Sequence, residues 1–241
     1  EEIILHTGQH FDKKMSQIFF DQLSIPQPKY NLEISSFSHG KMTGLMIKEI
    51  EKILLIEKPD FVLVYGDTNS TLAAALAASK LNIHLIHIEA GLRSFNLSMP
   101  EEINRILTDS ITNYFFTTSE YANKNLKKSG VKDENIFFVG NTMIDTLISN
   151  LENLRAPDFI KEIDDDFFIL TLHRPANVDD KNNLDGLLKN ISQAARGMKI
   201  IFPVHPRTHK TIKSIKSIPS NIMFIDPLPY LEFNYLVKNC K

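Results

Sequence analysis

Acidic side chains follow two short apolar runs of this chain, where each run gives way to glycine-containing sequence. Asp67 follows Phe61–Tyr65, Glu89 follows Ile83–Ile88, and Glu101 lies further along the chain. If the runs are parallel strands, their carboxyl ends meet at one edge of a sheet, which is where α/β proteins bind ligands. Carboxylates held there in unequal environments can divide the acid and base roles of a proton transfer.

Polar residues also follow other apolar runs, at points where a parallel strand would end. Gly8-Gln9-His10, Gly140-Asn141-Thr142 and His173-Arg174 occupy such positions. Polar groups at several strand ends indicate a shared cleft, and the fork of an arginine suits a phosphate or carboxylate. The residues therefore indicate proton transfer beside an anionic group. Two α/β halves with a cleft between them suggest a nucleotide-linked substrate.

Each of these candidates has a structural alternative. Asp67 or Thr68 could cap the helix that follows, and Glu101 could favour the N-terminus of its own helix. His173 could be a buried structural histidine, and the same holds for His205. From the residues alone these alternatives stay open.

The spacing of other reactive residues excludes several chemistries. His84 and His87 lie three positions apart in a predicted strand, so they point to opposite faces and make a poor metal site. The Gly-x4-Gly-Lys-Ser/Thr frame of a phosphate loop is absent, as is the Gly-x-Ser-x-Gly elbow of a serine nucleophile. Cys240 is the single cysteine, so no internal disulfide can form. We expect no metal ion.

The composition is that of an ordinary globular protein. The 241 residues are 43% apolar and 23% charged, and the formal net charge is −2. This charge implies no overall attraction to nucleic acid or to an anionic membrane. No apolar run approaches the ~20 residues that span a bilayer, and no basic-then-apolar leader is recognisable. We expect a cytoplasmic protein without nucleic-acid or membrane partners.

Short apolar runs alternate with longer amphipathic ones, which predicts βαβ units and an α/β fold with parallel sheets. A composition shift around Arg155–Asp166 places a domain boundary near residue 155, giving domains 1–155 and 156–241. The predicted strands are 3–7, 32–34, 61–65, 83–88, 114–117, 136–139, 167–172, 199–204 and 222–225, and the predicted helices are 11–23, 41–57, 72–79, 101–109, 120–129, 142–154, 182–196 and 230–238.

An ordered set of motifs resembles one enzyme family. The motifs are Gly66-Asp67-Thr68, His87-Ile88-Glu89-Ala90-Gly91-Leu92-Arg93, Pro100-Glu101-Glu102-x-Asn104-Arg105, Gly140-Asn141-Thr142-x-Ile144-Asp145 and His173-Arg174-x-x-Asn177. Together they closely resemble the non-hydrolysing UDP-N-acetylglucosamine 2-epimerases, over essentially the whole chain. Gln9-His10 and Pro203-Val204-His205 fit the same pattern.

The resemblance implies a GT-B-like fold of two Rossmann-like, doubly wound parallel-sheet domains with a nucleotide sugar in the interdomain cleft. The family interconverts UDP-GlcNAc and UDP-ManNAc. It removes the C2 proton, eliminates UDP to leave 2-acetamidoglucal, and adds UDP back after protonation from the other face. It needs no redox cofactor, and its members suggest a homodimer.

The resemblance also implies roles for individual residues. Asp67, Glu89 and Glu101 match the family's catalytic carboxylates, and His173 matches its catalytic-site histidine. Which carboxylate removes the C2 proton and which returns it stays open. The implied substrate-binding residues are Gln9, His10, Arg93, Arg105, Asn141, Arg174 and His205, of which Gln9, His10 and His205 match a region where bacterial members bind a second, regulatory UDP-GlcNAc.

The chain departs from the family pattern in three places. It has Ala176 where many members have glutamate. The family's Gly-Thr-Arg-Pro-Glu and Ser-Gly-Gly-x-x-Glu-Glu segments, which contact the nucleotide and its diphosphate, are absent. We therefore expect both domains to be incomplete, and the 241 residues alone to be inactive or nearly so.

Three other functions remain open. A GT-B-type glycosyltransferase would need an acceptor, and a hydrolysing epimerase would release free ManNAc and UDP. A non-catalytic nucleotide-sugar-binding module would bind ligand without exchanging the C2 proton.

Overall fold

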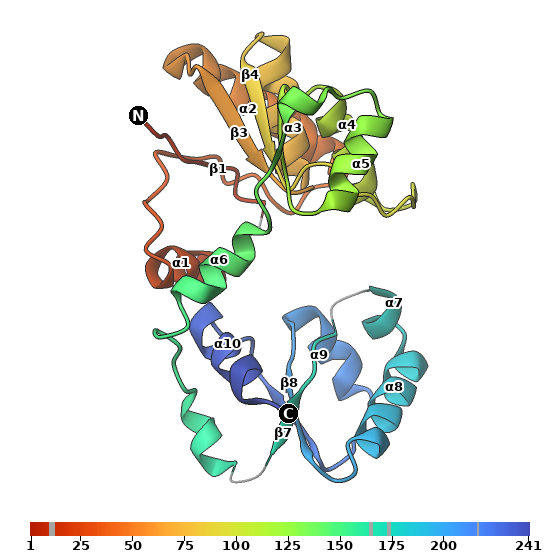
Figure 1. Cartoon of the computed structure of the whole chain (residues 1–241). Helices are drawn as coiled ribbons and strands as arrows, with labels where there is room; N and C mark the ends of the chain where they lie inside the picture. Colours follow the sequence, from red (N-terminus) through yellow and green to blue (C-terminus); the bar gives the residue numbers. More distant parts are fainter. Residues whose placement is uncertain (10–12, 164–165, 173–174, 216) are drawn as a thin grey trace. The chain divides into compact units, whose positions relative to one another are not determined.

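The computed structural model describes residues 1–9, 13–163, 166–172, 175–215 and 217–241 (Figure 1). Contacts between Cα atoms divide the chain into two compact units. The first holds Glu1–Phe20 and Ser24–Ser149, and the second holds Asp21–Leu23 and Asn150–Lys241. The domain ranges 1–155 and 156–241 remain a prediction.

The first unit contains a parallel four-stranded sheet in the order β3-β4-β5-β6, together with a separate parallel pair, β1-β2. Tyr65 lies opposite Ile88, and Ile88 lies opposite Phe116. The carboxyl ends of β3, β4 and β5 are therefore level with one another. The strands are β1 (Leu5–His6), β2 (Tyr30–Asn31), β3 (Phe61–Tyr65), β4 (His84–Ile88), β5 (Tyr114–Thr117) and β6 (Ile136–Phe138), and the helices are α1 (Lys13–Gln22), α2 (His39–Glu57), α3 (Asn69–Lys80), α4 (Pro100–Ser110), α5 (Glu120–Lys128) and α6 (Thr142–Ser149), with a short 3₁₀ helix, η1 (Asp133–Asn135).

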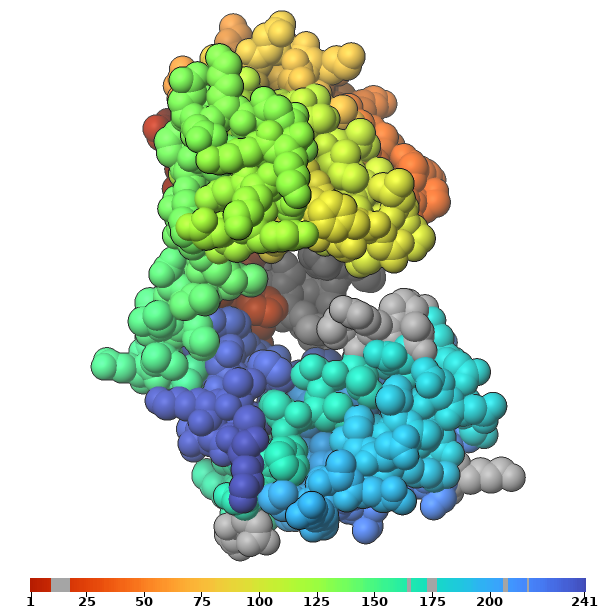
Figure 2. All heavy atoms as spheres, turned by 45° about the vertical axis from the view of Figure 1, so that its right-hand side comes forward, coloured from red at the N-terminus to blue at the C-terminus, as the bar shows by residue number. Residues whose placement is uncertain are grey.

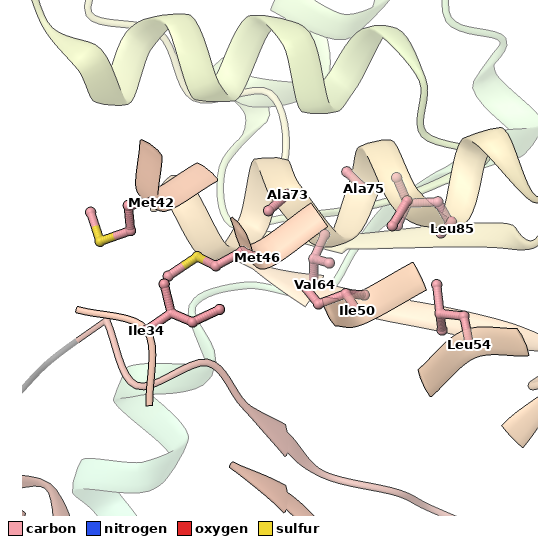
Figure 3. Packing of buried hydrophobic residues seen from close by; sticks show 11 residues of the cluster. Ile34, Met42, Met46, Ile50, Leu54, Val64, Ala73, Ala75 and Leu85 are labelled. Atoms are coloured by element: carbon pink, nitrogen blue, oxygen red, sulfur yellow. The ribbon is translucent and has the colours of Figure 1, made fainter. Parts of the chain in front are cut away.

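Helices α2 and α3 pack on the β3-β4 part of this sheet and form its main core (Figure 3). The buried residues of α2 recur at helical spacing, with Met46 and Ile50 at its centre. Four alanines of α3 are fully buried and let the helix approach closely, namely Ala73, Ala75, Ala77 and Ala78. Burying a side chain such as that of Met46 contributes about 1.5–3 kcal/mol.

The second unit contains a parallel three-stranded sheet in the order β7-β8-β9. Its core lies between this sheet and α8 and α9, with Leu184, Leu188 and Phe202 fully buried. The strands are β7 (Phe167–Ile169), β8 (Lys199–Pro203) and β9 (Ile222–Ile225), and the helices are α7 (Pro175–Val178), α8 (Lys181–Ala194), α9 (Pro206–Lys213) and α10 (Tyr230–Asn239), with the 3₁₀ helix η2 (Asp158–Glu162).

The parallel α/β architecture agrees with the prediction, but several element bounds were wrong. The predicted strand at 32–34 lies instead at β2, and Glu33 beyond it has a left-handed backbone with φ 53°, which interrupts the extended conformation. Helix α6 ends at Ser149 rather than at residue 154. There the carbonyl of Asn150 accepts from the N–H of Asn153 in a turn. The sequence did not predict α9, a short helix that begins at Pro206.

No helix in the described part of the chain is both long enough and apolar enough to cross a membrane.

Candidate active site

The turns that follow β3 and β4 lie beside each other and carry Asp67 and Glu89. The N–H of Gly66 donates to the carbonyl of Ile88 at 3.0 Å. Glu89 itself has a left-handed backbone with φ 72°, held by donation from its N–H to the carbonyl of Phe116 at 3.0 Å. Such a conformation costs a non-glycine residue about 1–2 kcal/mol, so the surrounding hydrogen bonds must hold it. Backbone strain of this kind clusters at functional sites.

Gly91 lets the loop after β4 pack against α5. Its φ is 79°, and a Cβ atom there would lie 2.6 Å from the carbonyl oxygen of Ala122. The side chain of Asn125 donates to the carbonyl of Gly91 at 2.9 Å. The β4–α4 loop then runs over the surface of the unit (Figure 2, yellow), where Phe95 and Leu97 are exposed.

Arg105 of α4 connects two carboxylates. Its Nε and Nη2 donate to Oδ2 of Asp67 at 3.0 and 2.7 Å, and its Nη1 donates to Oε2 of Glu102 at 2.6 Å. The neighbouring Asn104 donates to the backbone carbonyl of Asp67 at 2.8 Å. Helix α4 therefore fixes both the backbone and the carboxylate of Asp67.

Glu102 is buried and anchors the start of the β4–α4 loop. It accepts from the N–H and hydroxyl of Ser94 at 2.9 and 3.1 Å and from the N–H of Phe95 at 3.0 Å. Burial by itself raises the pKa of Glu102, but these donors and Arg105 outweigh it and hold the pKa below its usual value. The carboxylate is thus a fixed anion.

Glu89 differs from Glu102 in its burial, in its hydrogen-bond donors and in the direction in which its pKa is shifted. No group in the described part of the chain donates a hydrogen bond to its partly buried carboxylate. Burial, followed by the negative charge of Asp67, raises the pKa of Glu89, although Arg105 and His87 act in the opposite direction. A carboxyl group with a raised pKa and no fixed donor is suited to exchanging a proton.

Glu101 lies in the first turn of α4 with an exposed side chain. Within the residues that the structure describes, its carboxylate has neither a hydrogen bond nor an ion pair. This placement fits both a catalytic carboxylate and a favourable charge at a helix N-terminus. The catalytic role of Glu101 stays a prediction.

Arg93, His87 and Asp109 form a buried charged network behind this edge. Arg93 Nη1 lies 2.6 Å from Asp109 Oδ2 and also donates to the carbonyl of Leu92. His87 Nδ1 lies 2.7 Å from Asp109 Oδ1. Arg93 thus orients a buried carboxylate, and its role in substrate binding stays a prediction.

Gln9 reaches the start of α3. Its Oε1 accepts from the N–H and hydroxyl of Ser70 at 3.0 and 2.8 Å. The N-cap of α3 is Thr68, which accepts from the N–H of Thr71. Asp67 is therefore not the capping residue, and its carboxylate faces Arg105 instead.

Of the remaining candidate binding residues, the structure describes Asn141 and His205. Asn141 Oδ1 accepts from the N–H of Met143 at 3.0 Å, at the start of α6. His205 follows β8 in the second unit with an exposed side chain. His10, His173 and Arg174 lie outside the described residues. In the described segments, no three His, Cys, Asp or Glu side chains gather in a way that could hold a metal ion.

Glu102, Asp109 and His87 were not among the site residues predicted from the sequence. A usable signal was present for the first two: Glu102, Arg105 and Asp109 recur at helical spacing and so share one face of α4. His87 was considered only as a metal ligand.

The structure defines an α/β protein with unequal carboxylates at the carboxyl edge of a parallel sheet. Comparison with known proteins identifies its relatives. Residues 1–241 match the family model described as UDP-N-acetylglucosamine 2-epimerase. The chain belongs to this family, and its fold is GT-B-like.

Individual relatives agree with this assignment. The UDP-N-acetylglucosamine 2-epimerase of Methanocaldococcus jannaschii is 49% identical, over 99% of this chain and 69% of that protein. A crystal structure of the M. jannaschii enzyme with UDP-GlcNAc and UDP superposes with a TM-score of 0.88 at 48% identity, and covers 99% of this chain and 69% of that one. The UDP-2,3-diacetamido-2,3-dideoxy-D-glucuronate 2-epimerase of Pseudomonas aeruginosa is 47% identical, over 98% of this chain and 67% of that protein.

Proposed function

We propose that the protein containing this chain is a non-hydrolysing epimerase that interconverts UDP-GlcNAc and UDP-ManNAc. The observation that carries the proposal is the pair of unequal carboxylates at one sheet edge. Asp67 is held by Arg105, whereas Glu89 has a raised pKa and no donor in the described segments. Family membership and the UDP-GlcNAc in the crystal structure of the M. jannaschii enzyme support the choice of sugar nucleotide.

The proposed reaction needs a proton acceptor and a proton donor on opposite faces of the sugar. A carboxylate takes the C2 proton, the C–H electron pair forms the C1=C2 double bond, and the C1–O bond breaks so that UDP leaves with its electron pair. UDP then attacks C1 again while the double-bond electrons take a proton at C2 from the other face. We assign one of these proton transfers to Glu89 and the other to Asp67 or to Glu101. Which residue acts as the base and which as the acid stays open.

Arg105 would tune this pair of carboxylates. It neutralises Asp67 directly and opposes the rise in the pKa of Glu89. We further propose that His173 completes the catalytic site, that Arg174 and Asn141 contact the substrate, and that Gln9, His10 and His205 contribute to a second UDP-GlcNAc site. The homodimer also remains a proposal.

A second candidate substrate is a UDP-2,3-diacetamido-2,3-dideoxyglucuronate. The observation in its favour is the 47% identity to the P. aeruginosa enzyme of that name, almost as high as the 49% to the M. jannaschii enzyme. The same C2 chemistry would serve both sugars, because they differ from each other at C3 and C6 rather than at C2.

Proton NMR in deuterated water tests both candidates. The complete gene product containing these residues is incubated with each sugar nucleotide. Loss of the C2 proton signal together with growth of the 2-epimer identifies the substrate, and Asp67→Asn, Glu89→Gln and Glu101→Gln then separate the roles. Free sugar and UDP would identify a hydrolysing enzyme. Binding of UDP by folded protein without C2 exchange would overturn the epimerase proposal in favour of a transferase, tested with an acceptor, or a binding module.

A further inference from the structure

His87 is a fully buried histidine whose two ring nitrogens both face hydrogen-bond acceptors. Nδ1 lies 2.7 Å from Oδ1 of Asp109, and Nε2 lies 2.8 Å from the backbone carbonyl oxygen of Gly66. A carbonyl can only accept, so Nε2 carries a proton. Nδ1 faces a carboxylate, which also accepts unless it is protonated. The geometry is satisfied when the ring is an imidazolium that donates from both nitrogens.

Asp109 is placed to hold such a cation. Its side chain is 4% exposed, and it accepts from the N–H of Gly91 at 3.1 Å and pairs with Arg93 at 2.6 Å. The strand neighbours of His87 in register are Val64 and Phe115, which contribute no charge. Arg93 and the imidazolium of His87 are then two buried cations beside one anion, Asp109. The positive charge of His87 also acts on Glu89, whose pKa it lowers.

This network connects every segment that carries a candidate catalytic carboxylate. Gly66 directly precedes Asp67, and His87 lies two residues before Glu89 on β4. Asp109 lies on α4, the helix that carries Glu101 and Arg105. One imidazole ring therefore bonds to the β3 turn and to α4, while it belongs to the strand that Glu89 follows.

We propose that His87 is a positioning residue: as a buried imidazolium joining Asp109 to the carbonyl of Gly66, it holds the Asp67 and Glu89 turns in the arrangement the reaction requires. Its effect on turnover rests on the proposed epimerase function, whereas its protonation and hydrogen bonds do not. The neighbouring His84 is exposed on the opposite face of β4 and takes no part.

The protonation is tested first, by ¹⁵N NMR of histidine side chains in the 241-residue chain. His87→Gln identifies the signals of His87 by their loss. We expect two protonated ring nitrogens at pH 7 with slow hydrogen exchange. A ring with one unprotonated nitrogen at that pH would overturn the proposal. This readout requires no turnover, so it remains decisive even if the proposed function fails.

The positioning role is tested by kinetics of the complete gene product. Gln can donate from Nε2 to the Gly66 carbonyl but carries no charge. Leu can neither donate a hydrogen bond nor carry a charge. We expect kcat to fall about 10-fold for His87→Gln and about 100-fold for His87→Leu, as small misplacements of reacting groups do, with KM changed less than about 3-fold. Equal kcat values for wild type and folded His87→Gln would contradict the proposal.

The pH profile separates positioning from simple loss of packing. The charged groups that act on Glu89 are Asp67, Arg105 and His87, and of these His87 is removed. The limb of the kcat/KM profile set by Glu89 should move to higher pH in His87→Gln, because a positive charge that favours its ionised form is lost. Leu85→Ala, in the core on the same face of β4, should lower thermal stability without moving that limb, and His84→Gln should change neither. An unmoved limb in His87→Gln would overturn the electrostatic part of the role.

Discussion

Glu102 and Asp109 lie on the buried face of α4, and each accepts hydrogen bonds from several donors. Glu89 follows β4, and the charge of Arg105 acts on its pKa, yet no donor in the described part of the chain bonds to its carboxylate. The pKa of Glu102 is lowered and that of Glu89 is raised. Glu102 and Asp109 therefore hold the loops in place, whereas Glu89 is left able to exchange a proton.

This difference shows how a site can be both rigid and reactive. An anion with its full set of donors strongly resists protonation, so it is a stable anchor for loops. A partly buried carboxylate without donors is easier to protonate and costs folding stability when charged. We expect substitution of an anchoring carboxylate such as Glu102 to lower folding stability, and substitution of Glu89 to lower turnover.

The largest effect is expected for Glu89→Gln. Removing a proton-transfer group should lower kcat by about 10²- to 10⁴-fold. Folding should hardly change, because no hydrogen bond in the described segments depends on this carboxylate. Steady-state kinetics and urea unfolding measure the two effects. Normal turnover by Glu89→Gln would remove Glu89 from the mechanism.

The adjacent pair Glu101 and Glu102 gives the sharpest test of the comparison. Glu102→Gln removes the buried negative charge that pairs with Arg105. It also replaces one of the two oxygens that accept from Ser94 and Phe95 with an NH2 donor, so the free energy of unfolding should fall by about 3 kcal/mol. Glu101→Gln should change it by less than about 0.5 kcal/mol while reducing turnover. Urea unfolding decides, and equal losses of stability in the two variants would contradict the distinction.

Gly91→Ala tests how tightly the anchored loop is packed. A left-handed alanine costs about 1–2 kcal/mol, and its Cβ would also meet the carbonyl of Ala122 at 2.6 Å. Gly130 is the matched control, because it has a similar φ of 87° but no atom within 4 Å of its Cβ position. Gly91→Ala should therefore destabilise the protein by about 1–3 kcal/mol more than Gly130→Ala. Equal melting temperatures would show that α5 can move away.

The smallest effect is expected in the pH dependence of stability. The folded-state pKa of Glu102 is lowered, so its contribution is present above the unfolded pKa and is lost as the pH falls through the folded value. The folded-state pKa of Glu89 is raised, so its contribution is full below the unfolded pKa and is lost as the pH rises through the folded value. The stability gap between wild type and Glu102→Gln should thus shrink in acid. At neutral pH, the Glu89→Gln variant should be slightly more stable than the wild type. Urea midpoints at several pH values measure both trends.

Much of the first unit could be predicted because its signals are local. Phe61–Tyr65 and Tyr114–Thr117 have the predicted bounds, since short β-branched and aromatic runs between breakers have few other structures open to them. Helix α6 was predicted too long, because a continuing apolar pattern does not show where a turn begins. The placement of Asp67 and Glu89 at neighbouring strand ends followed from the alternation of strands and helices alone.

By itself, the sequence determined the parallel α/β order, the glycines that turn the chain after β3 and β4, and the carboxylates that follow them. It did so because strand, helix and turn preferences depend on neighbouring residues. Only the tertiary structure decided that Glu102 rather than Glu101 is buried, that Arg93 pairs with Asp109, and that His87 bonds to Gly66. These contacts depend on the rotation of α4 about its axis and on loop closure across 16 residues for Arg93 and Asp109 and 21 residues for His87 and Gly66, which local preferences do not set.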